Sequence, residues 1–192
     1  LFWLSVVLVA YVYAGYPLLL GLWAQAFGRP VRKRPSSSRD EWPAVSVVLA
    51  AHDEAQQLHG RLVNLLEQIY PGRLEVIVVS DGSMDDTSAV LARFGTRIRA
   101  IELPRGGKPT ALNAGVAAAT GEIVVFADAR QRFGPDPIPE LVANFADSDV
   151  GGVSGELIVD CEDDDATVDS TIGSGVGLYW KYEKWLRRHE SR

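Results

Sequence analysis

The sequence predicts an α/β domain with a mostly parallel sheet, helices on both faces of that sheet, and one transmembrane helix ahead of it. Three observations lead to this prediction. Short apolar runs rich in valine alternate with segments of helical periodicity. These runs are apolar almost throughout, which is typical of strands buried on both faces of a parallel sheet. The first 28 residues contain no Asp, Glu, Lys or Arg.

The uncharged segment 1–28 is predicted to cross a membrane. A transmembrane helix needs about 20 predominantly apolar residues, and this segment provides them. Trp23 is expected at the level of the lipid headgroups, where aromatic rings are favoured, and Pro17 is a candidate for a kink. The alternatives are a buried core helix and a cleaved signal peptide, although a signal peptide has a shorter apolar stretch.

Residues 29–43 form a basic, serine-rich linker. Five basic residues follow the apolar segment closely: Arg29, Arg32, Lys33, Arg34 and Arg39. Basic residues that flank a span stay on the cytoplasmic side. We therefore expect a protein of the cell membrane with its N-terminus outside and residues 44–192 in the cytosol. Contact of these charges with anionic headgroups would give the same orientation.

Residues 44–192 form the predicted α/β domain. Strands are expected at 45–50, 74–79, 98–103 and 123–127 and within 150–159, and helices at 54–68, 83–94, 110–119 and 137–145. The acidic segment 160–169 is predicted to be a solvated loop, and 178–186 an amphipathic helix that needs an apolar partner. The last segment resembles a helix cut in mid-course, so we expect the domain to be incomplete at its C-terminus.

Polar or glycine-rich residues follow each of the first four predicted strands. They are Ala51-His52-Asp53-Glu54, then Ser80-Asp81-Gly82-Ser83, then Arg105-Gly106-Gly107-Lys108, and finally Asp128-Ala129-Arg130. Each group alone has an ordinary explanation, such as a helix cap, a turn or a solvated charge. However, ligands of parallel sheets bind outside the carboxyl ends of the strands. The four groups together therefore predict one shared ligand site.

The chemistry of these residues indicates a nucleotide-sugar donor. The Asp81 carboxylate can accept a hydrogen bond from the N–H edge of a pyrimidine, and Lys108 can meet phosphate as a point cation. Asp128 can bind a hard divalent cation, which takes few carboxylates plus substrate phosphates. A base, a diphosphate and a metal are the parts of such a donor site.

Four ordered motifs resemble those of the family 2 glycosyltransferases, which have the GT-A (Rossmann-like) fold and include the membrane-bound synthases of cellulose, chitin and hyaluronan. The motifs are VSVVLAAHDE at 45–54, VVSDGS at 78–83, GKPTALNAG at 107–115 and FADAR at 126–130. The resemblance covers about residues 45–188. It implies an inverting hexosyl- or N-acetylhexosaminyl-type transferase of polysaccharide biosynthesis, with a UDP-sugar as donor and a glycan or lipid as acceptor.

The resemblance also implies a role for each matching residue. His52 and Glu54 would lie in the nucleoside pocket, Asp81 would contact the base, and Lys108 would lie near the base and diphosphate. Asp128 would be the first acid of the metal-binding Asp-x-Asp motif, with Mg²⁺ or Mn²⁺ as the cofactor.

Three positions depart from the family pattern. Asp53 stands where Asn is common, and Ser80 stands where an acid often precedes Asp81. Arg130 occupies the position of the second acid of Asp-x-Asp. Arginine cannot bind a metal, but it can bind diphosphate oxygens bidentately. The alternative is that Arg130 faces solvent while Asp128 and the phosphates hold the metal.

The general base of the reaction is not assigned. The family places this acid in a later motif, which we expect beyond Arg192, so the 192-residue chain alone is expected to be inactive. Two alternatives remain. A sugar-phosphate nucleotidyltransferase usually has a glycine-rich loop after the first strand, where this chain has Ala51-His52-Asp53-Glu54. A non-catalytic membrane subunit would keep the fold as a scaffold.

Composition and missing motifs exclude several other classes. The net charge of −6 argues against nucleic-acid binding, since such proteins present basic faces to phosphates. The single cysteine, Cys161, forms neither an internal disulfide nor a thiolate zinc cluster. The glycine patterns of P-loop NTPases and of dinucleotide-binding Rossmann enzymes are both absent from the sequence.

Overall fold

The computed structural model describes residues 1–35, 42–156 and 182–186. The chain divides into two units, one of Leu1–Arg32 with Glu156–Arg192 and one of Lys33–Gly155. The first unit contains α1 (Phe2–Ala10), η1 (Tyr11–Gly15) and α2 (Tyr16–Phe27). The second contains β1 (Val45–Ala51), α3 (Ala55–Leu66), β2 (Leu74–Asp81), α4 (Thr87–Ala92), η2 (Gly95–Arg97), β3 (Arg99–Leu103), α5 (Lys108–Ala118), β4 (Ile123–Ala127), α6 (Pro137–Ala143) and η3 (Asn144–Ala146).

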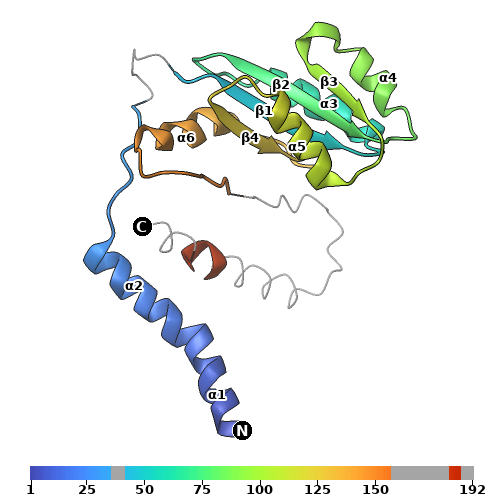
Figure 1. Cartoon of the computed structure of the whole chain (residues 1–192). Helices are drawn as coiled ribbons and strands as arrows, with labels where there is room; N and C mark the ends of the chain where they lie inside the picture. Colours follow the sequence, from blue (N-terminus) through green and yellow to red (C-terminus); the bar gives the residue numbers. More distant parts are fainter. Residues whose placement is uncertain (36–41, 157–181, 187–192) are drawn as a thin grey trace, which may run out of the picture. The chain divides into compact units, whose positions relative to one another are not determined.

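The described strands form one sheet in the order β3-β2-β1-β4, and every neighbouring pair is parallel (Figure 1). The chain runs from β1 to β2 and β3 in one direction. It then crosses back through α5 and adds β4 on the other side of β1. The strand order therefore reverses between β1 and β4. Ligands bind at such a reversal, because the loops leaving the two strands diverge there and open a crevice.

Helices cover both faces of the sheet, as the sequence predicts. The side chains of β1 alternate between the faces, so Val47 and Leu49 pack with one cluster and Val48 with the other. The first cluster lies under α3, α4 and α6, and its fully buried helix residues are Leu58, Leu62, Leu65, Ile138 and Val142. The second lies under α5, through Ala111 and its neighbours. The predicted fold class is confirmed.

Helix α5 lies very close to the sheet at Gly115. A Cβ atom at this position would be 2.4 Å from Cγ1 of Val48. The absence of a side chain therefore sets how near α5 can lie to β1. Since Lys108 is the first residue of α5, this packing also fixes the origin of the Lys108 side chain at the sheet edge.

The predicted elements are found at nearly the predicted places, with one exception. The strand expected within 150–159 is wrong for residues 150–156, which contain no strand in the structure. Gly151, Gly152 and Gly155 lie in this stretch, and glycine in a strand costs backbone entropy and contributes no side chain to pack. Residues 157–159, the acidic segment 160–169 and residues 178–181 of the predicted amphipathic helix lie outside the described residues.

The predicted span is helical from Phe2 to Phe27. Its length and composition suffice to cross a membrane, although a signal sequence near an N-terminus would meet the same criterion. Only 11% of its most apolar window is buried, which argues against a buried core helix. The π-helical turn η1 ends two residues before Pro17, where proline removes a backbone donor. The later segment 182–186 is helical.

Candidate donor-binding site

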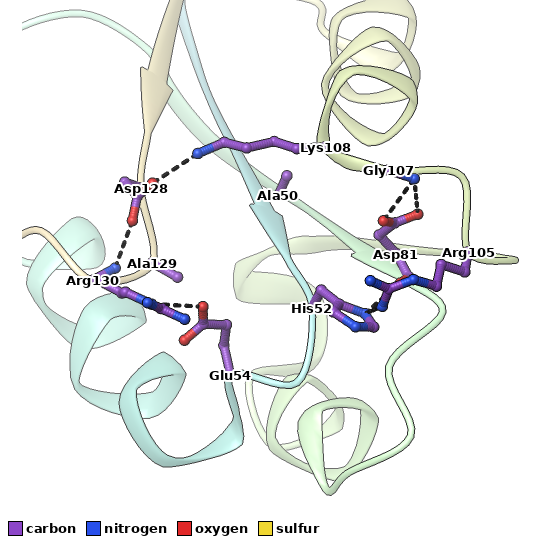
Figure 2. Close-up of a pocket in the computed structure, with 10 residues that line it drawn as sticks. All are labelled: Ala50, His52, Glu54, Asp81, Arg105, Gly107, Lys108, Asp128, Ala129 and Arg130. Carbon is purple, nitrogen blue, oxygen red and sulfur yellow. Dashed lines mark hydrogen bonds and ion pairs between the residues drawn. The ribbon is translucent and has the colours of Figure 1, made fainter.

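A pocket of about 420 Å³ opens at the carboxyl ends of the strands. It is lined by Ala50, His52, Glu54, Asp81, Arg105, Gly107, Lys108, Asp128, Ala129 and Arg130 (Figure 2). All six residues that the sequence assigns to the nucleotide, the diphosphate or the metal are among them. The parallel sheet brings them together because each follows or ends a strand at the same edge. We refer to this cavity as the first pocket.

The loop after β1 is tied to the loop after β2. Asp53 has a φ of 51°, a conformation that Asp and Asn adopt more readily than most residues. Its Oδ1 accepts a hydrogen bond from Met84 N at 2.7 Å, and its own N–H donates to Ser83 Oγ at 3.2 Å. Glu54 N–H donates to Thr87 Oγ1 at 3.2 Å. These bonds place the side chains of His52 and Glu54 at the wall of the first pocket.

Asp81 holds the glycine loop that precedes α5. Its carboxylate accepts hydrogen bonds from Gly106 N at 2.6 Å and from Gly107 N at 2.9 Å. Gly107 has a φ of 87°, which favours glycine. Gly82, which directly follows Asp81, has a φ of 60°, and a Cβ there would lie 2.6 Å from Arg105 N. Asp81 thus positions the loop that carries Lys108, in addition to any contact with a base.

Lys108 and Asp128 form an ion pair across the first pocket, with Nζ 2.8 Å from Oδ2 (Figure 2). The other carboxylate oxygen of Asp128 accepts a hydrogen bond from Arg130 N at 3.0 Å. The hydrogen bond from Lys108, followed by the one from Arg130 N, holds the pKa of Asp128 below its usual range. Asp128 is therefore a carboxylate at neutral pH.

Arg130 forms a second ion pair, in which its Nε is 3.0 Å from Oε1 of Glu54. The Arg130 side chain is 73% exposed, whereas that of Glu54 is 14% exposed. The exposed guanidinium can therefore turn away from Glu54 without disturbing the core. Two ion pairs, Lys108–Asp128 and Arg130–Glu54, thus pair four of the charged side chains that line the first pocket.

Two site residues were not predicted from the sequence: Arg61 and Asn64. Arg61 Nε donates to the carbonyl oxygen of Asp128 at 2.9 Å. Asn64 accepts from Phe133 N at 2.9 Å and donates to Phe133 O at 3.0 Å. Both residues of α3 therefore fix the loop after β4. The sequence could have indicated a buried role for Arg61, because this residue lies on the apolar face of its helix, beside Leu58 and Leu62.

Arg105 lies beside His52, with Nη1 3.0 Å from His52 Nδ1. The same ring nitrogen is 2.8 Å from the carbonyl oxygen of Asp81. The tautomer of His52 decides between these partners, because Nδ1–H donates to the carbonyl whereas a bare Nδ1 accepts from Arg105. Arg105 adds a third cationic side chain to the first pocket, next to Lys108 and Arg130.

The first pocket can hold a divalent cation only if a bound ligand supplies further oxygen atoms to coordinate it. Within the described residues, no three His, Cys, Asp or Glu side chains are grouped to hold a metal. Asp128 is the carboxylate at the end of β4, and the nearby Glu54 is paired with Arg130. Mg²⁺ binds one or two carboxylates together with substrate phosphates. Asp128 meets that minimum, provided that a diphosphate supplies further oxygen ligands.

Comparison with known proteins gives consistent matches. Residues 46–189 match the model of a family described as Glycosyl transferase family 2. An uncharacterised glycosyltransferase of Nostoc sp. is 32% identical over 138 residues, which cover 70% of this chain and 42% of the relative. The undecaprenyl-phosphate 4-deoxy-4-formamido-L-arabinose transferase of Sodalis glossinidius is 33% identical over 161 residues, or 76% of this chain and 49% of that protein.

A solved structure shares the fold. The mannosyltransferase of Pyrobaculum calidifontis, in complex with GDP-Man and Mn²⁺, has a TM-score of 0.56 and 30% sequence identity to this chain. The match covers 73% of this chain and 41% of that protein. The chain thus spans less than half the length of this neighbour and of the two relatives above.

Proposed function

Because this chain belongs to the family 2 glycosyltransferases, we propose that the whole protein is a membrane-anchored, inverting glycosyltransferase that uses a nucleotide-diphosphate sugar. The family match bears out the resemblance carried by the four motifs and decides against the nucleotidyltransferase alternative. The observation that supports the proposal most directly is the first pocket. It combines Arg105, Lys108 and Arg130 with Asp128 at the point where the strand order reverses.

The first pocket would hold the nucleoside diphosphate of the donor. His52, Glu54 and Asp81 would lie at the nucleoside, and the cationic side chains would lie at the phosphates. A diphosphate carries enough negative charge to draw Lys108 from Asp128 and Arg130 from Glu54. Guanidinium groups bind phosphate bidentately, while the ammonium group of lysine acts as a point charge.

In an inverting transfer, an acceptor oxygen bonds to the anomeric carbon as the bond from that carbon to the diphosphate breaks. The acceptor proton passes to a base within hydrogen-bond reach. Mg²⁺ or Mn²⁺, held by Asp128 and phosphate oxygens, would neutralise charge on the departing diphosphate when bound. Lys108 and Arg130 would contribute positive charge at the same group. No described residue is assigned as the base.

Both UDP and GDP are candidate nucleotides. The sequence motifs favour a UDP-sugar, whereas the structural neighbour from Pyrobaculum calidifontis contains GDP-Man. A lipid acceptor is supported by the Sodalis relative, whose name specifies undecaprenyl phosphate, and by the apolar helix from Phe2 to Phe27. A glycan acceptor is the alternative. The cytosolic placement of the catalytic domain depends on the basic linker.

Calorimetric titration of the full-length protein with UDP and with GDP tests the donor site. Asp81→Ala removes the anchor of the glycine loop, and Lys108→Ala removes a phosphate contact. A lost charged hydrogen bond costs about 1.5–3 kcal/mol, so we expect a roughly tenfold to hundredfold weaker affinity. Arg97→Ala, at an exposed arginine in η2, is the control and should bind normally.

Normal affinity in both the Asp81 and Lys108 variants would refute this site. Transfer from a labelled nucleotide-sugar into native membranes then tests catalysis. Binding without any transfer by the full-length protein would favour the non-catalytic subunit over the enzyme.

A further inference from the structure

A second pocket, of about 250 Å³, adjoins the first. Its lining consists of Gln57, Gly60, Arg61, Ala129, Arg130 and Arg132. Ala129 and Arg130 line both pockets, so the loop after β4 is their common wall. Three of the six lining residues are arginines and none is acidic. This second pocket is therefore positively charged.

Arg61 is a buried cation whose hydrogen-bond partners are neutral. It is 2% exposed, and its bonds go to the carbonyl oxygen of Asp128 and to Oδ1 of Asn64, at 2.9 and 2.6 Å. Its guanidinium also lies 4.3 Å from the ring centroid of Phe133. The remaining nitrogen, Nη2, is buried and has no hydrogen-bond partner among the described residues.

The Arg61 guanidinium remains charged at neutral pH. Burial is the main cause that lowers its pKa, to about 10, while Asp128 opposes this effect and the nearby Arg132 adds to it. That value still lies far above 7. A buried charge without a paired counter-charge is costly to keep in a folded protein. An anion in the second pocket would offset that cost and would also reduce the repulsion between Arg61 and Arg132.

The other two arginines of the second pocket are accessible. Arg132 is exposed, and in the described part of the chain it forms no ion pair. Arg130 is 73% exposed, and its side chain pairs with Glu54. Arg130 would meet the donor diphosphate in the first pocket, so Arg132 is the accessible guanidinium group left for a second ligand when nucleotide is bound. Guanidinium groups bind phosphate oxygens bidentately.

We propose that the second pocket is a binding site for a phosphate dianion, separate from the site of the donor diphosphate and able to be filled at the same time. Two sources share this chemistry: a phosphate ester carried by the acceptor, and free inorganic phosphate. The proposal rests on the proposed function only in assigning the nucleotide to the first pocket.

The test is calorimetry on the full-length protein in detergent at pH 8, with inorganic phosphate and with phenyl phosphate as probes. Each probe is titrated first alone and then with the first pocket saturated by UDP or GDP. Arg132→Gln is the principal variant, because Arg132 is exposed and its replacement leaves the core intact. Arg97→Gln is the matched control, at an exposed arginine of η2 that lines neither pocket.

We expect at least one probe to bind with nucleotide present. Arg132→Gln should weaken that binding about tenfold, the effect of one lost charged hydrogen bond, while Arg97→Gln should change it less than twofold. Tighter binding of phenyl phosphate would identify an acceptor ester as the source, and tighter binding of inorganic phosphate would identify the free ion.

Three results would overturn the proposal: no binding of either probe, displacement of both probes by saturating nucleotide, or equal affinity in Arg132→Gln and the wild type. If neither UDP nor GDP binds, the proposed function fails instead. In that case the titrations without nucleotide still test the second pocket through Arg132→Gln.

Discussion

Arg130 is the residue that separates this site from the usual Asp-x-Asp pattern. By the motif resemblance it stands at the position of the second acid, and its Nε lies 3.0 Å from Oε1 of Glu54. The substitution replaces a negative charge by a positive one beside Asp128. We expect Arg130 itself to neutralise part of the negative charge on the diphosphate, so that less of this charge is left for a bound metal cation to neutralise.

Restoring the acid with Arg130→Asp tests this interpretation. Without added metal, the variant should bind nucleoside diphosphate about tenfold more weakly, because one charged hydrogen bond to phosphate is lost. Addition of Mn²⁺ should recover affinity, since two carboxylates would then hold the ion. Arg130→Ala is the control, which loses the cation without gaining an acid. Equal responses of the two variants to Mn²⁺, measured by calorimetry, would contradict the prediction.

The ion pair between Lys108 and Asp128 predicts a pH dependence of stability. Lys108 depresses the pKa of Asp128 in the folded protein. The pair therefore stabilises the fold fully above the ordinary carboxyl pKa of about 4, and this contribution is lost as the pH falls through the depressed value. Lys108→Met should lower the melting temperature slightly at pH 7, and its difference from the wild type should shrink as the pH falls through the depressed pKa of Asp128. A difference that grows on acidification would show that the sign is wrong.

The sequence predicted that the six candidate ligand residues would meet at one site, and they line one pocket because the carboxyl ends of parallel strands share one edge. It did not predict Arg105 beside His52. It also did not reveal that Asp81 is bound to Gly106 and Gly107. Hydrogen bonds between loops depend on distances between segments far apart in the chain. Residue type and local periodicity contain no information about such distances.

Helix α5 shows how one element places the site. Its close approach to β1 depends on Gly115, where a Cβ would meet Val48 at 2.4 Å. Gly60 in α3 is the opposite case, since a Cβ there would have no neighbour within 4 Å. The two positions therefore form a matched pair of helical glycines.

Gly115→Ala should destabilise the domain by about 1–3 kcal/mol, the usual effect of overpacking a core. Gly60→Ala should instead stabilise it by about 0.5–1 kcal/mol, because alanine favours a helix. Thermal unfolding of the full-length protein measures both. Loss of nucleotide binding is expected in Gly115→Ala, since α5 begins at Lys108. Equal melting temperatures would refute the role assigned to Gly115.

The strands of the sheet were predictable because they are continuous apolar runs. β1 and β2 keep nearly every side chain buried, so hydrophobicity alone indicates them. The prediction failed at 150–156, where valines are separated by Gly151, Gly152 and Gly155. The valines suggested a strand. The glycines oppose one, because glycine loses more backbone entropy than other residues when it is fixed in a sheet.

The basic linker predicts how the whole molecule is oriented in a membrane. A reporter that is active only in the cytosol, fused after Arg192, should be active because Arg29, Arg32, Lys33 and Arg34 follow the apolar helix. Replacement of these four residues by glutamine should lower the cytosolic fraction. A well-expressed fusion with a silent reporter would contradict the predicted orientation, and a fusion released into the soluble fraction would favour a cleaved signal peptide.

The two ion pairs of the first pocket have a consequence for selectivity. In these pairs, the carboxylates of Asp128 and Glu54 compete with a ligand for the cations of Lys108 and Arg130. A neutral sugar offers nothing to either cation, and a singly charged compound can satisfy only one of them while its partner carboxylate loses its counter-ion. A nucleoside diphosphate can displace both carboxylates at once. We therefore expect the site to select ligands with at least two negative charges. It should exclude the abundant neutral and monoanionic metabolites of the cell.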